Sequence, residues 1–106
     1  MGKRTEFIDY LLELLQPFGD VTARSMFGGY GIYKDGKMFA IVVDDELYFK
    51  VTDSNRPDFL ERGLKPFTYE RKGKKVAMSY YQAPAECLDE SRFMVEWTET
   101  TVRVIR

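Results

Sequence analysis

The chain has 106 residues, a length typical of one domain, and 44% of them are apolar, which is enough to form a hydrophobic core. Sixteen basic and seventeen acidic residues give a net charge of −1, so no overall positive charge draws the chain to nucleic acid or anionic lipid. The absence of histidine and the single cysteine exclude histidine-based triads, histidine-containing zinc sites and internal disulfides. We therefore expect one cytoplasmic domain over residues 1–106 that needs no metal or cofactor and does not enter membranes.

The first predicted element is an amphipathic helix over about residues 3–16. Its apolar side chains recur at helical spacing and form one stripe, made of Phe7, Ile8, Leu11, Leu12 and Leu15. Pro17 and Gly19 follow the stripe, and both residue types interrupt helices. We therefore expect the helix to end there.

After this helix the pattern changes to short β-type runs bounded by turn residues, which predicts consecutive antiparallel strands. The runs are 26–27, 30–33, 38–43 and 47–51. Asp35-Gly36 separates two of them and is typical of a type I′ hairpin turn, in which both central residues have positive φ. Asp44-Asp45 is expected to form the next turn.

A short helix is predicted next, because residues 53–55 (Asp-Ser-Asn) offer N-cap side chains, Pro57 suits a first helical turn and Gly63 suits a C-cap. Two further strands are predicted at 66–70 and 76–82. They flank a basic segment, which predicts a second hairpin whose tip is formed by Arg71, Lys72, Gly73, Lys74 and Lys75.

The C-terminal stretch favours a helix that begins at Asp89 or Glu90, with Asp89 as its cap. Its apolar residues keep a helical stripe from Phe93 onward. Because β-branched residues are frequent near the end, helix and strand both stay open for residues 100–106.

Together these elements predict an α+β fold of two layers, with an antiparallel sheet of about five to six strands and the helices on one face. The expected order is a helix, three or four strands, a short helix, two strands and a helix.

The most unusual stretch is RSMFGGYGIY, residues 24–33, which holds three of the eight glycines within four positions. Glycines there allow a β-bulge or a sharp bend, with Met26, Phe27 and Ile32 turned to the core. A phosphate-binding glycine loop instead runs from a strand into a helix. This one leads into a strand, so we favour the structural interpretation over binding of a nucleotide or another small anion.

Several segments resemble the N-terminal domain of the TfoX/Sxy family, and together they cover the chain from about Phe7 onward. The longest is residues 24–51, whose core motif is Met26, Phe27, Gly28, Gly29, Tyr30 and Gly31. The other matching segments are Asn55-Arg56-Pro57, Pro66-Phe67-x-Tyr69, Met78-Ser79-Tyr80-Tyr81 and a final helix with Trp97.

The founding members of this family are bacterial regulators of natural competence, described as coactivators that work with the cyclic-AMP receptor protein. The resemblance therefore implies a regulatory role and a two-layer fold with an antiparallel sheet. It brings no catalytic or cofactor-binding residues. The founding members carry a second, helical C-terminal domain, and we expect this chain to be of the stand-alone kind that lacks it.

We expect a regulatory or adaptor domain that performs no catalysis and binds a protein, with the transcription machinery as candidate partner and homodimerisation as an alternative. Strand alternation places Tyr33 opposite its core-facing neighbour, and the glycines leave backbone accessible beside Arg24. We therefore predict a binding face around Arg24, Tyr30 and Tyr33, because Tyr and Arg often anchor interfaces. Two alternatives stay open: these side chains brace the sheet, or Arg24 pairs with Asp44 or Glu46.

The runner-up function is direct nucleic-acid binding through the basic tip, by Arg71, Lys72, Lys74 and Lys75. Nearby Tyr69, Tyr80 and Tyr81 would stack on bases if one sheet face exposed all three. A hairpin tip is also a place where solvated charges prevent edge-to-edge pairing of sheets. We favour the solvated turn.

Two remaining features suggest no chemistry. The carboxylates of Asp44, Asp45 and Glu46 can hold a cation, but a turn explains them more simply. Cys87 has no histidine to activate it, so we predict an inert thiol.

Overall fold

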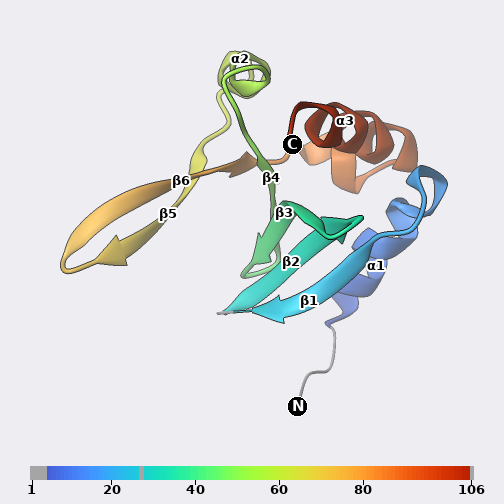
Figure 1. Cartoon of the computed structure of the whole chain (residues 1–106), viewed down its shortest axis with the longest axis horizontal. Helices are drawn as coiled ribbons and strands as arrows, with labels where there is room; N and C mark the ends of the chain where they lie inside the picture. Colours follow the sequence, from blue (N-terminus) through green and yellow to red (C-terminus); the bar gives the residue numbers. More distant parts are fainter. Residues whose placement is uncertain (1–4, 27, 106) are drawn as a thin grey trace.

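The computed structural model describes residues 5–26 and 28–105 (Figure 1). Its elements in chain order are α1 (Glu6–Leu14), the 3₁₀ turn η1 (Gln16–Phe18), β1 (Thr22–Met26), β2 (Gly29–Lys34), β3 (Lys37–Val43), β4 (Glu46–Lys50), α2 (Arg56–Glu61), β5 (Pro66–Arg71), β6 (Lys74–Gln82), the 3₁₀ turn η2 (Ala85–Leu88) and α3 (Ser91–Val104). This order confirms the predicted α+β fold. No helix in the described part of the chain is long and apolar enough to span a bilayer.

The sheet has six strands in the order β1-β2-β3-β4-β6-β5, and every neighbouring pair is antiparallel. Strands β1 to β4 follow one another through hairpins. After β4 the chain passes through α2 and returns as the β5–β6 hairpin, which extends away from the other strands in Figure 1. Because β6 pairs with β4, the edges of the sheet are β1 and β5.

Three two-residue turns connect these strands, and all have positive φ at both positions. The φ values are 52° and 79° for Asp35 and Gly36, 53° and 59° for Asp44 and Asp45, and 54° and 81° for Lys72 and Gly73. This is the conformation of type I′ turns, whose twist matches that of the flanking strands. The two predicted acidic turns and the basic hairpin tip are therefore confirmed.

The core lies between the sheet and the helices, and α1 and α3 lie on the same side of the sheet in Figure 1. It is formed by Ile8 and Leu11 of α1, Met94 of α3, Phe59 of α2 and the inward side chains Ile32, Phe39, Phe49 and Leu47 of the strands. The sheet face that points away from the helices is called the open face below. No helix of residues 5–26 and 28–105 lies over it.

Both ends of the N-terminal helix differ from the predicted 3–16. The helix ends at Leu14, ahead of the 3₁₀ turn that contains Pro17. At its start the hydroxyl oxygen of Thr5 accepts a hydrogen bond of 3.2 Å from the amide of Ile8, which caps the helix. Residues 3 and 4 lie outside the described residues.

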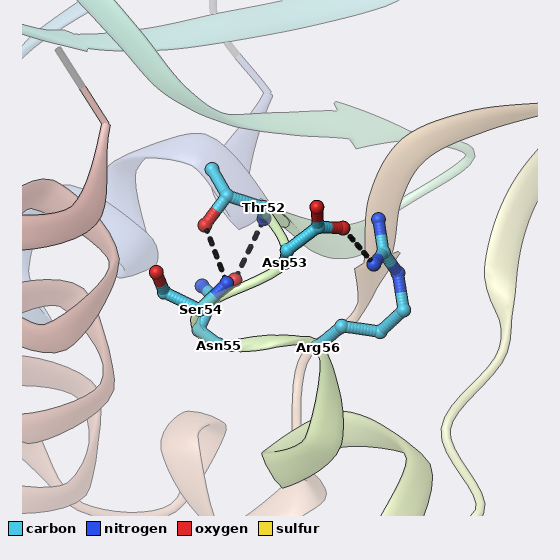
Figure 2. Close-up of polar contacts among 5 residues, drawn as sticks. All are labelled: Thr52, Asp53, Ser54, Asn55 and Arg56. Atoms are coloured by element: carbon cyan, nitrogen blue, oxygen red, sulfur yellow. Dashed lines mark hydrogen bonds and ion pairs between the residues drawn. The ribbon is translucent and has the colours of Figure 1, made fainter.

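The turn before α2 is held by its own polar side chains (Figure 2). Asn55 is buried at the N-cap, but its side chain does not cap α2. The side-chain oxygen Oδ1 of Asn55 accepts a hydrogen bond from the backbone amide of Thr52 at 2.7 Å, and the side-chain Nδ2 donates one to the backbone carbonyl of Lys50 at 3.2 Å. The Thr52 hydroxyl oxygen accepts from the amide of Ser54, and Arg56 pairs with Asp53. Asn55 thus joins the end of β4 to the start of α2.

The final helix begins at Ser91 with Glu90 as its N-cap, so the predicted capping role of Asp89 is wrong. The Ser91 hydroxyl donates to the carbonyl of Leu14 at 2.9 Å and joins the start of α3 to the end of α1. The helix continues to Val104 despite its β-branched residues. Tertiary packing decides this, because Thr101 is buried and its hydroxyl donates to the carbonyl of Trp97.

Candidate protein-binding face

The glycine motif forms the floor of the open face. In β2, Gly29 and Gly31 alternate with Tyr30 and Ile32, so the two glycines lie on the open face while Ile32 is buried in the core. A Cβ on Gly29 would lie 2.1 Å from the carbonyl oxygen of Val42. At Gly31 the Cβ position is 2.6 Å from the sulfur of Met38 and 3.0 Å from that of Met26. The glycines therefore let the β3 backbone and two methionine side chains pack closely against β2.

The predicted bend in this motif is present at Gly28, which has a φ of 65° in the turn between β1 and β2. The β-bulge lies further along, between Ile32 and Tyr33 where β2 pairs with β3. Phe27, which the sequence analysis assigned to the core, lies outside the described residues. The motif thus combines a hairpin turn with a close strand contact.

An apolar groove of about 360 Å³ opens beside Gly29. It is lined by Met26, Met38, Met78, Ile41, Val43 and Phe67, together with Gly29, Tyr30 and Tyr69. None of these residues is charged. The prediction that Met26 turns to the core is wrong, because its side chain belongs to the open face and is 39% exposed.

Much of the exposed apolar surface gathers at this groove. The described residues include five exposed large hydrophobic side chains, and three of them, Met26, Tyr69 and Met78, line it. Scattered apolar residues are normal on a protein surface, but a contiguous patch is typical of an interaction site. Methionine is common at such sites because its flexible thioether adapts to different partners.

Two cation–aromatic pairs lie on the same sheet face as the groove. The Arg24 guanidinium lies 5.5 Å from the centre of the Tyr33 ring, and the Lys50 ammonium lies 5.1 Å from that of Tyr80. Both are cation–π contacts. The open face therefore carries positive charge that is ordered against aromatic rings.

A pair of aromatic rings joins the central strands to the β5–β6 hairpin. The rings of Tyr48 and Phe67 meet edge to face, with their centres 5.2 Å apart. The Tyr48 hydroxyl donates to Glu46 at 2.8 Å. Burial, reinforced by this hydrogen bond to Glu46, raises the pKa of Tyr48 to about 12.

The predicted binding residues divide between the two faces of the sheet. Arg24 and Tyr33 share the open face and touch each other. Tyr30 pairs with the buried Val42 and packs against the core, although it also lines the groove. In the described part of the chain no ion pair joins Arg24 to Asp44 or Glu46, the alternative considered from the sequence.

The four cations of the basic tip, Arg71, Lys72, Lys74 and Lys75, are all exposed. The three tyrosines near it do not form one stacking surface. Tyr69 is exposed, Tyr80 is only 5% exposed beneath Lys50, and Tyr81 packs on Phe59 with the ring centres 6.0 Å apart. The hairpin thus offers charge without a set of free rings.

A second cavity, of about 380 Å³, lies between α2, η2 and α3. Four acidic side chains, Asp58, Glu61, Glu86 and Glu96, line it together with Arg62. Arg62 pairs with Glu86 at 2.5 Å and lies 5.4 Å from the centre of the Trp97 ring. The hydrogen bond from Arg62 lowers the pKa of Glu86.

Two further reactive features lie among the described residues, a thiol and a turn of two carboxylates. Cys87 is fully buried, and its burial, reinforced by Glu86, raises the pKa of the thiol to about 12. Asp44 and Asp45 form a hairpin turn. Among residues 5–26 and 28–105 no group of three potential metal ligands converges.

Sequence reasoning missed most of the groove, including Met38, Ile41, Phe67 and Met78. One signal was available. Residues 38–43 are apolar at every position, whereas a strand with a polar outer face alternates. An uninterrupted apolar strand in a sheet with helices on one face predicts an apolar open face.

These features describe a small α+β domain with an open, apolar and cation-rimmed sheet face. Residues 13–105 match the model of the TfoX N-terminal domain, and the chain belongs to that family. This confirms the resemblance derived from the residue motifs.

Three curated proteins are similar in sequence to part of the chain. It is 31% identical to Protein Sxy of Escherichia coli (strain K12) over 70 residues, which are 66% of this chain and 34% of that protein. It is 33% identical to DNA transformation protein TfoX of Haemophilus influenzae over 85 residues, 78% of this chain and 39% of that protein. It is 30% identical to DNA transformation protein TfoX1 of Aliivibrio fischeri over 67 residues, 63% of this chain and 32% of that protein. The matched regions thus span about a third to two fifths of these relatives.

Proposed function

We propose that this chain is a regulatory domain, active in the control of bacterial DNA transformation, that performs no catalysis and acts by binding another protein through its open face. Membership of the TfoX N-terminal domain family and the names of two relatives as DNA transformation proteins support the regulatory part. The candidate partner is a component of the transcription machinery.

One observation carries the protein-binding part. Within the described part of the chain the sheet has helices on one side, and its other side holds an uncharged groove with exposed Met26, Tyr69 and Met78. Aromatic, methionine and arginine side chains are enriched in the cores of protein interfaces. The buried, high-pKa Cys87 is consistent with a role other than catalysis.

Photocrosslinking in living cells tests this proposal directly. A benzophenone amino acid replaces Met78 in the groove or, as a matched control, Leu60 on α2, which is also an exposed apolar residue. We expect a discrete crosslinked protein from position 78 and none of the same size from position 60. Absence of a specific product at position 78, or the same product from both positions, would contradict the proposal.

Direct nucleic-acid binding is the second candidate, supported by the four exposed cations of the basic tip. Each phosphate contact contributes about one unit to the slope of log affinity against log salt concentration. Replacement of Lys74 and Lys75 by Glu would then abolish binding. We expect gel shifts at physiological salt to find no binding of the unmodified domain to duplex or single-stranded DNA, and micromolar affinity would promote this candidate above the first.

A further inference from the structure

We propose that the segment bound by the open face is acidic as well as apolar, with carboxylates placed to meet the cations around the groove. This inference rests on the proposed function, because it specifies the partner chemistry of the same face. It follows from the charges of the face, the lining of the groove and the state of the aromatic rings.

The charges on the open face have mainly one sign. Strand alternation places four cations there, Arg24, Lys50, Arg71 and Lys74, against one strand carboxylate, Glu46. That carboxylate already accepts the Tyr48 hydrogen bond. The chain as a whole has a net charge of −1, so this positive charge is a local property of the face.

The negative charge lies elsewhere in the molecule. All charged residues of α1 are acidic, namely Glu6, Asp9 and Glu13. The turn of Asp44 and Asp45 follows Val43 at one end of the groove. A bound segment is therefore expected to place its carboxylates toward β1 and the basic hairpin tip, and away from that turn.

The groove itself selects apolar side chains. Its residues are uncharged and include three thioethers. The cations follow from the strand register: Arg24 is two residues from Met26, Arg71 is two residues from Tyr69, and Lys50 pairs with Tyr80, two residues from Met78. This arrangement of an apolar centre with a charged rim is the usual anatomy of a protein interface. The rim charges would steer the partner and set its orientation, while the groove would supply most of the affinity.

The same face is a poor match for single-stranded nucleic acid. Base stacking needs free ring faces, and Tyr69 is exposed on this face. The other rings are engaged, because Arg24 covers Tyr33, Lys50 covers Tyr80, and Tyr48 meets Phe67 edge to face. Methionine, isoleucine and valine side chains fit aliphatic groups better than polar base edges. The observations therefore favour an acidic peptide segment.

Methionine methyl NMR provides a test with an internal control. Met26, Met38 and Met78 line the groove, while Met94 is fully buried in the core. The probes are three synthetic 16-residue peptides with identical Leu and Phe positions and with Glu, Gln or Lys at the polar positions, together with a thymidine oligonucleotide. We expect the Glu peptide to shift the three groove methyls, to leave Met94 unchanged and to bind at least tenfold more tightly than the Gln peptide.

Charge reversal identifies the cations involved. Arg24→Glu and Lys50→Glu should each weaken binding of the Glu peptide about tenfold, and added salt should weaken it further. Arg92→Glu, on the exposed side of α3, is the matched control and should change nothing. Unchanged circular dichroism spectra of all three variants will show that they fold.

Several results would overturn the inference. These are equal binding of the Glu and Lys peptides, groove shifts caused by the oligonucleotide alone, no shift with the Glu peptide, and a stable dimer of the chain that buries Met78. If crosslinking at position 78 succeeds while the Glu peptide fails, the proposed function stands and only the partner chemistry is wrong. If crosslinking at position 78 fails, the proposed function itself is wrong.

Discussion

The carbonyl oxygen of Val42 lies 2.1 Å from the point where a Cβ on Gly29 would stand. No side chain fits there, so the second glycine of the family motif is fixed by the backbone of the neighbouring strand. The same residue is one of those that line the groove. One glycine thus contributes to the packing of the sheet and to the shape of the candidate binding face.

Gly29→Ala is expected to lower the free energy of unfolding by about 1 to 3 kcal/mol, because β2 and β3 must separate locally to admit the methyl group. Gly28→Asn is the control. Gly28 has open space around its Cβ position and a φ of 65°, a conformation that asparagine tolerates. Denaturant midpoints compare the two, and equal midpoints for Gly29→Ala and the unmodified chain would refute the close-contact explanation.

Asn55→Ala is expected to cost about 1 to 3 kcal/mol of stability, since it leaves the part-buried amide of Thr52 and the carbonyl of Lys50 without their partner. Ser54→Ala, at the exposed neighbouring position, should stay within about 0.5 kcal/mol of the unmodified chain. Urea unfolding measures both. Similar effects of the two changes would mean that the Asn55 hydrogen bonds contribute nothing.

The thiol of Cys87 should be nearly unreactive in the folded chain. Burial removes access and raises its pKa to about 12, so at pH 8 very little thiolate is present. With a colorimetric disulfide reagent we expect labelling to be more than about a hundredfold slower in native buffer than in guanidinium. Comparable rates in the two solvents would show that the thiol is accessible.

Alkaline pH should weaken the fold through Tyr48. Its pKa is about 12 in the folded chain and about 10 in the unfolded chain, so the folded state retains the proton longer. The stabilising contribution is complete below pH 10 and declines as the pH rises toward 12. Tyr48→Phe should therefore flatten the loss of stability between pH 10 and 12 without removing it, because the pKa of Tyr80 is raised as well. An unchanged slope would contradict the assignment.

The sequence predicted features that depend on neighbouring residues. Asp35-Gly36 and the basic tip specify their turns locally, because few residue types accept positive φ in succession. It did not predict features that depend on distant segments. Met26 and Met38 lie near Phe67 and Met78 in the groove because β6 pairs with β4 and β5 pairs with β6, which places β5 and β6 in the same sheet. Met26 was assigned to the core for the same reason, since its face is set by the pairing of the whole sheet.

The central claim is that the open face, and not the helical side, binds the partner. The most direct test first identifies the partner by crosslinking at position 78. The recovery of that partner by co-purification from cells is then compared between the Met78→Glu and Leu60→Glu variants, without crosslinking. Both positions are exposed and apolar, so both variants should keep the melting temperature of the unmodified chain. We expect Met78→Glu to reduce partner recovery about tenfold or more and Leu60→Glu to leave it unchanged. Full recovery with Met78→Glu, or equal loss with both variants, would contradict the claim.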